Sequence, residues 1–339
     1  MARIFVTGAT GLLGHAVLPL LQSAGHETRA LVRNPDAAAR WSGQGSVTPV
    51  RGDMLNVPAW EGALEGCDAV LHLAACYTGY VTGEAGEDTL MKTNVDATLR
   101  LAEAAERHAV GRMIFVSSAG VSRLGKAPID ESTAFDTGTD NAYFLSKIKA
   151  EQALDGFLAK APRLSVVIAR PSMMMGPDDP GPTPTGRFVR AYLRRELPVV
   201  LPGRAVIIDA RDVAAAFLRM LDIGACGERF VLGGSEIGFP DLYALLEQIS
   251  GIPMPAKRPP YWLALTVMTV LKTLGRDVPV APRDLRRMQQ LIAPEASKMR
   301  SRLGVVPRPI EETLKDTVAW FQSRPDSAPI PAATMRQAG

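Results

Sequence analysis

Three polar side chains in the first half of the sequence have the types and spacing that proton transfer requires. Tyr143 and Lys147 are four residues apart in a segment with helical spacing, so both side chains project from one face of a helix. A free tyrosine has a pKa of ~10, and a nearby ammonium group favours the phenolate and lowers that value. Ser118 follows an apolar run that ends at Val116, and its hydroxyl could orient a substrate oxygen. The pattern predicts a tyrosine that exchanges a proton with a carbonyl or an alcohol.

Each of these residues has a simpler explanation when it is taken alone. The Tyr-x-x-x-Lys spacing is common by chance and describes many pairs on helix surfaces, and Ser118 alone would be a turn or helix-capping serine. Side chains that follow the carboxyl ends of central parallel strands lie where such sheets bind ligands. The elements that position the three residues therefore decide whether they act together.

The first predicted strand, residues 4–6, leads into three glycines at intervals of three and then into a segment with helical spacing. In this setting Gly8 permits a tight turn, Gly11 lets a pyrophosphate approach the backbone, and Gly14 lets the helix pack closely on the strand. The helix N-terminus offers unpaired N–H groups to the phosphates. We therefore predict a dinucleotide site with phosphate contacts at Gly8, Thr10, Gly11, Leu12, Leu13 and Gly14.

The end of the predicted strand 28–32 indicates which dinucleotide binds. NAD-binding sheets usually carry Asp or Glu there, about 20 residues after the glycines, to hold the ribose 2′-hydroxyl. That acid is absent, and Arg33 stands beside its place. A guanidinium suits a 2′-phosphate by its charge and by its bidentate geometry. We predict NADP(H) rather than NAD, with a solvated surface arginine as the alternative explanation of Arg33.

Short β-branched strands alternate with helical segments through the first half of the chain, which indicates a parallel sheet with helices on both faces. The predicted strands are residues 4–6, 28–32, 47–50, 69–73, 113–116 and 165–168, and the predicted helices are 12–24, 94–108 and 142–159. After Pro171 we predict a loop at 177–186, late strands at 206–208 and 230–232, and helices at 241–249, 261–274, 283–291 and 310–321.

The resulting fold class is α/β. We expect a doubly wound parallel sheet of the Rossmann type in residues 1–172 and about 206–235. A smaller, mostly helical substrate lobe would comprise residues 173–205 and 236–323, and residues 324–339 would form a flexible tail.

Composition bears on partners and location. Hydrophobic residues make up 47% and charged residues 22%, as in ordinary globular domains, and the net charge of +3 gives no reason to expect nucleic acid or an anionic membrane as the main partner. Three scattered cysteines without metal-ligand spacing indicate reduced thiols, no metal and a cytoplasmic location. The most apolar stretch, residues 261–274, is too short to span a bilayer. It predicts a buried helix or a lid over the substrate, with a peripheral membrane contact as a further alternative.

Taken together, the motifs resemble the extended short-chain dehydrogenase/reductase family, also known as the NAD-dependent epimerase/dehydratase superfamily. The order and spacing match over residues 3 to about 175, with weaker matches at 209–214, 232–234 and 303–304. The motifs are the glycine turn, Gly52-Asp53-Met54, His72-Leu73-Ala74-Ala75, Asn94, Ser117-Ser118-Ala119-Gly120, Tyr143-x-x-x-Lys147 and Arg170-Pro171.

The resemblance implies a role for each matching residue. Asn94 would brace the active site, Ser118 would position the substrate, Tyr143 would transfer the proton, and Lys147 would assist it and hold the nicotinamide ribose. Further cofactor contacts would come from Asp53, Met54, Leu73, Ala74, Ala75, Ser117, Pro171, Ser172 and Met173. Simpler explanations are a turn residue for Asp53 and a helix cap for Asn94. His72 is read as a buried strand residue with satisfied hydrogen bonds.

Two branches of the family match different features. The dihydroflavonol-reductase and 3β-hydroxysteroid-dehydrogenase branches, which act on an apolar ketone or alcohol, match Val32-Arg33 and Ser117-Ser118-Ala119-Gly120-Val121. Nucleotide-sugar epimerases and dehydratases, which keep NAD tightly bound, place an arginine before the late strand, and Arg204 could fill that role. A third alternative is a non-catalytic NADP-sensing module, although such relatives lose the tyrosine–lysine pair.

The remaining expectations concern the substrate and the assembly. The methionines of residues 173–175 and the apolar residues 261–265 suit a greasy small-molecule substrate, although methionines also fill cores. The expected substrate contacts are Tyr77, Ser118, Met174 and Arg204. A basic C-terminal surface is predicted to be solvated, with a contact to an anionic substrate tail as the alternative; it comprises Arg283, Arg286, Arg287, Lys298, Arg300 and Arg302. By resemblance, helices 94–108 and 142–159 would form the interface of a homodimer.

Overall fold

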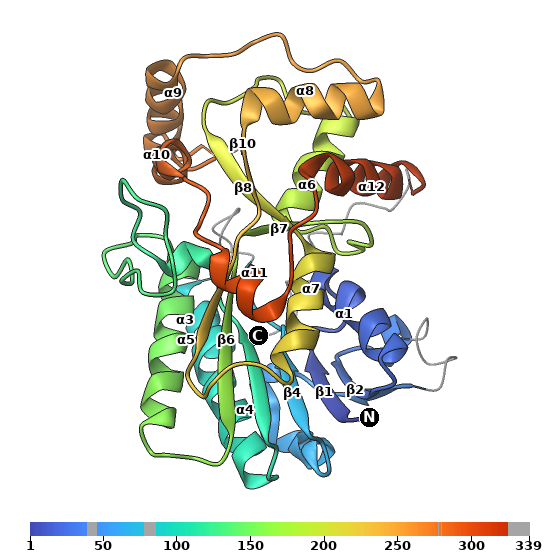
Figure 1. Ribbon diagram of the computed structural model, residues 1–339. Coiled ribbons are helices and arrows are strands. Elements are labelled where there is room, and N and C mark those ends of the chain that lie inside the picture. Colours follow the sequence, from blue (N-terminus) through green and yellow to red (C-terminus); the bar gives the residue numbers. More distant parts are fainter. Residues whose placement is uncertain (39–45, 78–85, 277, 279, 325–339) are drawn as a thin grey trace.

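The computed structural model describes residues 1–38, 46–77, 86–276, 278 and 280–324. Seven parallel strands form its main sheet in the order β3-β2-β1-β4-β5-β6-β9 (Figure 1). They are β1 (Arg3–Thr7), β2 (Glu27–Val32), β3 (Val47–Arg51), β4 (Ala69–His72), β5 (Arg112–Val116), β6 (Ser165–Pro171) and β9 (Arg229–Leu232). The predicted α/β fold is confirmed. The predicted flexible tail lies outside the described residues, apart from Arg324.

The strand order reverses at the centre of this sheet. The chain runs outward from β1 to β2 and β3, and then returns to place β4 on the other side of β1. Ligands of such sheets bind outside the carboxyl ends of the strands at this reversal. The glycine turn follows β1, and residues 73–75 follow β4, so both lie at the binding edge.

Helices cover both faces of the sheet (Figure 1). One face carries α1 (Leu12–Ser23), α7 (Ala210–Met220) and α11 (Ser297–Leu303), and the other carries α4 (Ala97–Arg107) and α5 (Ala142–Leu158). Successive side chains of a strand point to opposite faces. In β5, accordingly, Ile114 and Val116 belong to the first core, whereas Met113 and Phe115 belong to the second. This explains why the buried strands are continuously apolar.

A second lobe combines a small sheet with most of the C-terminal helices. Its sheet has the order β10-β8-β7, formed by β10 (Ser235–Gly238), β8 (Arg204–Asp209) and β7 (Met173–Met175). Its helices are α6 (Pro184–Leu193), α8 (Phe239–Ser250), α9 (Tyr261–Thr273), α10 (Pro282–Gln290) and α12 (Ile310–Gln322). Helices α6, α8 and α12 enclose an apolar core of their own. The predicted helical C-terminal lobe is confirmed, with a sheet that was not predicted.

Two boundaries differ from the sequence prediction. The predicted loop 177–186 ends early because α6 begins at Pro184, after Thr183, whose Oγ1 accepts a hydrogen bond from the N–H of Gly186 at 3.1 Å. Proline is favoured in the first turn of a helix, so its presence there marked a helix start. The range 206–235 is divided between the lobes: β9 joins the main sheet, whereas β8 pairs with β7 and β10.

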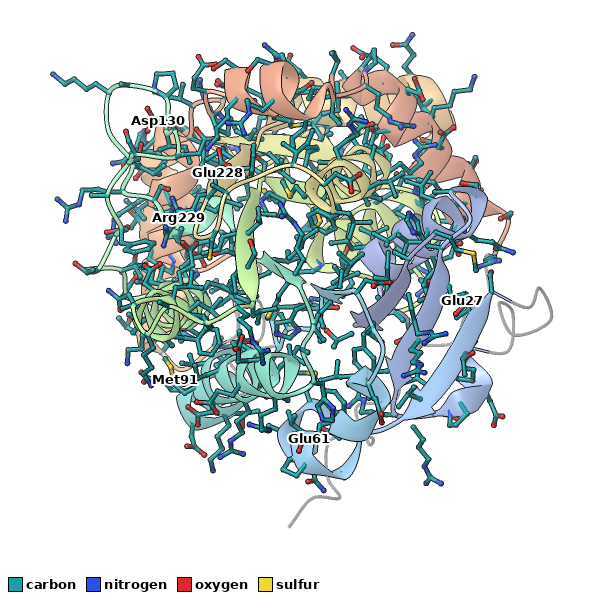
Figure 2. All side chains as sticks on the ribbon, turned by 60° about the horizontal axis from the view of Figure 1, so that its bottom comes forward. Glu27, Glu61, Met91, Asp130, Glu228 and Arg229 are labelled. Atoms are coloured by element: carbon teal, nitrogen blue, oxygen red, sulfur yellow. The ribbon has the colours of Figure 1, made fainter. Side chains whose placement is uncertain are left out.

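A buried carboxylate ties α5 to the sheet. Glu151 is fully buried and accepts hydrogen bonds from Nε and Nη2 of Arg170 in β6, at 2.9 and 2.7 Å. Glu151 also accepts a hydrogen bond at 2.9 Å from Nε of Arg229, the first residue of β9, which is labelled in Figure 2. These bonds fix the position of α5 along β6, and therefore the position of Tyr143 at the binding edge.

Candidate active site

The glycine turn between β1 and α1 is closely packed on its inner side. Gly8 has a φ of +72°, and a Cβ there would lie 2.6 Å from the backbone nitrogen of Ala74. A Cβ at Gly14 would lie 2.3 Å from the carbonyl oxygen of Ala9. At Gly11 the nearest atom is the carbonyl oxygen of Gly8, at an ordinary 3.6 Å. The turn therefore exposes its backbone and the N-terminus of α1, as a pyrophosphate site requires.

The residues expected near the adenosine follow β2 and β3. Arg33 is exposed directly after β2 and presents a cation where a 2′-phosphate is expected. Asp53 is exposed after β3, and its Oδ1 accepts a hydrogen bond from the N–H of Leu55 at 2.8 Å, so it caps a short helix. Met54 is buried in the core on the α4 face. The capping bond gives Asp53 a structural function of its own.

The backbone after β4 lies against the glycine turn. Leu73, Ala74 and Ala75 are half-buried there. The N–H of Ala74 donates to the Oγ1 of Thr7 at 3.2 Å, which holds this backbone beside the end of β1.

Buried His72 connects β4 to β1 and to α4. Its Nδ1 lies 2.7 Å from the Oγ1 of Thr7, and its Nε2 lies 2.8 Å from the Oγ1 of Thr98. The Thr98 hydroxyl donates to the carbonyl of Asn94, so Nε2 donates to Thr98 and Nδ1 accepts from Thr7. Burial, with a smaller contribution from Lys147, lowers the pKa of His72 to about 3. His72 is a neutral structural residue, as its sequence interpretation expected.

Asn94 joins the segment after β4 to the start of α5. It is buried in a π-helical turn (Lys92–Asp96), a feature frequent at functional sites. Its Oδ1 accepts from the N–H of Cys76 at 2.8 Å, and its Nδ2 donates to the carbonyl of Cys76 at 2.8 Å and to the Oγ of Ser146 at 2.9 Å. Ser146 in turn donates to the carbonyl of Tyr143 at 2.7 Å. Asn94 is therefore an interior bracing residue and not a helix cap.

Ser118 and Tyr143 line one cavity at the carboxyl edge of the main sheet, next to the second lobe. The cavity wall also includes the predicted contacts Tyr77, Ser117, Pro171, Ser172, Met173 and Met174. Residues from β5, α5 and β6 thus meet at a single place, although they are far apart in the sequence. This convergence is the geometric condition for joint action of the serine and the tyrosine.

Ser118 caps a turn, and its hydroxyl also lines the cavity, where it could bind a substrate oxygen. Its Oγ accepts a hydrogen bond from the N–H of Gly120 at 3.1 Å. A hydroxyl that accepts one bond can still donate its hydrogen. The capping bond therefore orients the hydroxyl, and a substrate oxygen in the cavity would receive its proton in a hydrogen bond.

Lys147 is buried on α5, one helical turn after Tyr143. Its Nζ donates to the carbonyl of Val116 at 2.7 Å and lies 4.9 Å from the centre of the Phe115 ring. Burial lowers the pKa of Lys147 to about 7, and the carboxylate of Glu151 opposes that shift. A lysine that exchanges its proton near neutral pH is suited to assist a neighbouring proton donor.

Two buried hydroxyls at this edge have no hydrogen-bond partner among the described residues. They are the Oγ atoms of Ser117, after β5, and Ser172, after β6. An unsatisfied buried hydroxyl is costly and calls for a partner. Because both serines line the cavity at the predicted nicotinamide end, they indicate that this edge is built around a polar ligand.

Helix α10 supplies three cavity residues, and the sequence interpretation assigned one of them, Arg287, to a solvated surface. Asp284, Arg287 and Met288 line the cavity, and the Arg287 side chain is only 17% exposed. Arg287 Nη2 donates to the carbonyl of Gly120 at 2.9 Å, and its guanidinium lies over the Phe144 ring. The surface interpretation was wrong for Arg287, because α10 folds back over residues more than 140 positions earlier in the chain.

The family model for the NAD dependent epimerase/dehydratase family matches residues 4–233, which include the glycine turn, the serine, the tyrosine and the lysine. The chain belongs to this family. Its members bind NAD(P), and the chain is an NAD(P)-dependent oxidoreductase of the extended short-chain dehydrogenase/reductase type. The open turn at Gly11 and the orphaned hydroxyls of Ser117 and Ser172 fit such a dinucleotide.

Two curated relatives match this chain over nearly its whole length. A Synechocystis sp. protein named as a dihydroflavonol 4-reductase is 32% identical, with 94% of each chain covered. The sterol demethylase protein B of Methylococcus capsulatus is 29% identical, over 94% of this chain and 98% of its own.

Solved structures support the same fold. The crystal structure of gox2253 superposes with a TM-score of 0.83 at 30% identity, covering 96% of this chain and 99% of that one. A UDP-glucuronic acid 4-epimerase from Bacillus cereus, solved with UDP-glucuronic acid and NAD, gives a TM-score of 0.77 at 19% identity over 95% and 99% of the two chains. The second likeness shows the fold alone.

One expected substrate contact lies elsewhere in this oxidoreductase. Arg204, considered as a clamp for a sugar diphosphate, forms an ion pair with Glu236 of β10 and is not among the described residues that line the cavity. Val206, two residues further along β8, does line it. Successive side chains of a strand point to opposite faces, so residues two positions apart point to the same face. Val206 and Arg204 therefore share one side of β8, at different distances from the cavity.

Proposed function

We propose that this protein is an NADP(H)-dependent oxidoreductase that reduces a ketone or aldehyde of an apolar small molecule, or oxidises the corresponding alcohol. The observation that carries the proposal is the shared cavity of Ser118 and Tyr143, with the buried ammonium of Lys147 bonded to the carbonyl of Val116, two residues before Ser118. The cavity has a mainly apolar wall with a smaller set of polar groups, which is the usual composition of a small-molecule site.

In the proposed reaction, Ser118 donates a hydrogen bond to the carbonyl oxygen and Tyr143 donates a proton to it. Lys147 assists Tyr143, and Asn94 holds the first turn of α5 in place through Ser146. When NADP(H) is bound, its nicotinamide supplies or accepts the hydride. The backbone around Gly11 and the hydroxyls of Ser117 and Ser172 would bind and orient the dinucleotide.

The cavity wall supports an apolar substrate. Side chains from separate elements contribute hydrocarbon surface to this wall: Leu124, Ile129, Phe144, Met173, Met174, Val206, Met288, Leu291 and Ile292. Val206 gives the cavity an apolar side chain where binding of a sugar nucleotide would favour a polar one. Arg204, the candidate ligand for a sugar diphosphate, is already paired with Glu236. Both observations favour the reductase over a nucleotide-sugar epimerase or dehydratase.

The preference for NADP(H) rests on Arg33, and its replacement tests it. We expect Arg33→Asp to lower kcat/KM for NADPH by about 10- to 100-fold, because a charge-assisted bidentate bond is replaced by repulsion, with a much smaller effect on NADH. Steady-state kinetics with both cofactors measure the ratio. Lys160→Asp makes the same charge change at the exposed far end of α5 and should leave the ratio unchanged. Equal turnover with NADH, insensitive to Arg33→Asp, contradicts the assignment.

A substrate screen tests the reaction class. The purified protein is analysed for retained nucleotide and then assayed for NADPH oxidation with a panel of apolar ketones and aldehydes, and separately for interconversion of nucleotide sugars. We expect net NADPH consumption with members of the apolar panel. Retained NAD together with sugar interconversion and no net oxidation would establish the epimerase instead.

A further inference from the structure

Helix α9 presents an apolar face to the exterior of the second lobe. Of its residues, only Ala264 and Met268 are buried. Five large apolar side chains on α9 and directly after it are exposed: Trp262 (67%), Leu263 (39%), Val267 (43%), Val270 (50%) and Leu274 (69%). The helix lies at the outer edge of the lobe beside α10 (Figure 1). The predicted buried helix is therefore wrong for most of this segment.

The exposed side chains form one continuous stripe. At 3.6 residues per turn, positions 262, 263, 266, 267, 270 and 274 fall within less than half of the helix circumference. The three threonines of α9 donate their hydroxyls to carbonyls of the same helix: Thr266 to Trp262, Thr269 to Leu265 and Thr273 to Val270, at 2.7 to 2.8 Å. Their hydrogen-bonding needs are met without water. We call residues 262–274 on this side the α9 face.

The segment around the α9 face is basic, although the whole chain is nearly neutral. Residues 248–276 contain four basic residues and no acidic one, and all four are exposed: Lys257, Arg258, Lys272 and Arg276. An apolar helix face with a tryptophan near its start and cations at both ends has the composition of a helix that lies in a membrane interface. Anionic lipid attracts each such cation.

We propose that the α9 face binds the surface of an anionic lipid bilayer. Among the helices that the structure describes, none is long and apolar enough to cross a membrane, so the contact runs along the surface. Trp262, Val267 and Val270 enter the boundary between headgroups and acyl chains, while Lys272 and Arg276 pair with lipid phosphates. A second copy of the chain is a poorer occupant, because self-association through this face brings like charges together.

The contact also places the cavity near lipid. Helix α10 packs against α9 and lines the cavity through Asp284, Arg287 and Met288. An apolar substrate dissolved in the bilayer would therefore be one helix away from the cavity. The binding itself does not depend on the proposed reaction, since it requires neither cofactor nor substrate.

Vesicle flotation of the full chain tests the proposal. Vesicles of phosphatidylcholine alone are compared with vesicles containing about one third phosphatidylglycerol, without cofactor. We expect the wild type to float with the anionic vesicles and to be released by high salt. Val270→Glu, in the middle of the α9 face, should reduce bound protein by about tenfold or more. Val306→Glu makes the same change at a residue that is 71% exposed elsewhere and should bind like the wild type.

The outcomes distinguish a lipid bilayer from a second copy of the chain as the binding partner of the α9 face. Wild-type protein that stays unbound with anionic vesicles overturns the proposal, as does Val270→Glu protein that floats equally well. Size-exclusion chromatography of the same samples detects a second copy as the occupant. An oligomer that Val270→Glu dissociates, without vesicle binding, also overturns the lipid assignment. Circular dichroism of both variants should match the wild type, because the changed residues are exposed.

Discussion

The Tyr143→Phe variant is expected to lose turnover by about 10²- to 10⁴-fold, the usual contribution of a positioned proton donor. The change removes one oxygen from a cavity-lining side chain and keeps its ring, which packs 5.6 Å from the ring of Phe144. The affinity for NADPH, measured by titration of cofactor fluorescence, should change little. Because the fold and the cofactor site remain, a loss confined to kcat identifies the phenol as the proton donor.

A matched variant makes the Tyr143 experiment specific. Tyr261→Phe removes the same atom from α9, outside the described lining of the cavity, and should retain wild-type turnover. If Tyr143→Phe kept turnover within about twofold of the wild type, the phenol would have no role in the reaction. A protein that bound NADPH but was indifferent to this change would match the non-catalytic sensor considered from the sequence.

The second large effect is on stability. We expect Glu151→Ala to lower the free energy of unfolding by about 3–5 kcal/mol, because it leaves the guanidinium of Arg170 buried without its carboxylate. Arg170 is 2% exposed, and both of its bonds to Glu151 are shorter than 3 Å. Urea unfolding followed by circular dichroism measures the change.

An exposed ion pair provides the control for Glu151. Glu27 pairs with Arg3 at 2.9 Å, with side chains 47% and 38% exposed, and Glu27 is visible at the edge of the molecule (Figure 2). Glu27→Ala should cost no more than about 1 kcal/mol. Similar losses for the two variants would show that burial of the Glu151 pair contributes nothing beyond an ordinary surface contact.

The main sheet could be predicted because its strands carry strong local signals. The runs around Ile114 and Val167 are too apolar for any exposed position, and the turn after β1 has no room for a side chain at Gly8 or Gly14. The arrangement of Ser118, Tyr143 and Lys147 followed from the sheet, since successive parallel strands end at the same edge. For these residues, local pattern and tertiary position agree.

The second lobe could be predicted only in outline, because its contacts join distant segments. Nothing local distinguishes Arg287, which bonds to the carbonyl of Gly120, from an exposed helix arginine. The sequence of β8 is as apolar as the strands of the main sheet. Its place in the smaller sheet follows only from its pairing with β7 and β10. The ion pair between Arg204 and Glu236 likewise depends on that pairing.

Helix α9 shows the limit of composition as evidence. Its apolar residues suggested a buried helix or a lid, but the structure buries only Ala264 and Met268 of this helix. Helical spacing separates two apolar faces, and only the fold shows which face packs inward. A sequence window that averages over the helix cannot make that distinction.

The most direct test of the central claim follows the hydride and the proton separately. NADPH deuterated at C4, on one face and then on the other, is supplied with an apolar ketone that the screen identifies, and the alcohol is analysed by mass spectrometry and NMR. We predict one deuterium on the carbinol carbon from only one of the two cofactors, one NADPH consumed per alcohol, and transfer by Tyr143→Phe that is about 10²- to 10⁴-fold slower. Alcohol without deuterium from either cofactor, or product formed without net loss of NADPH, would contradict it.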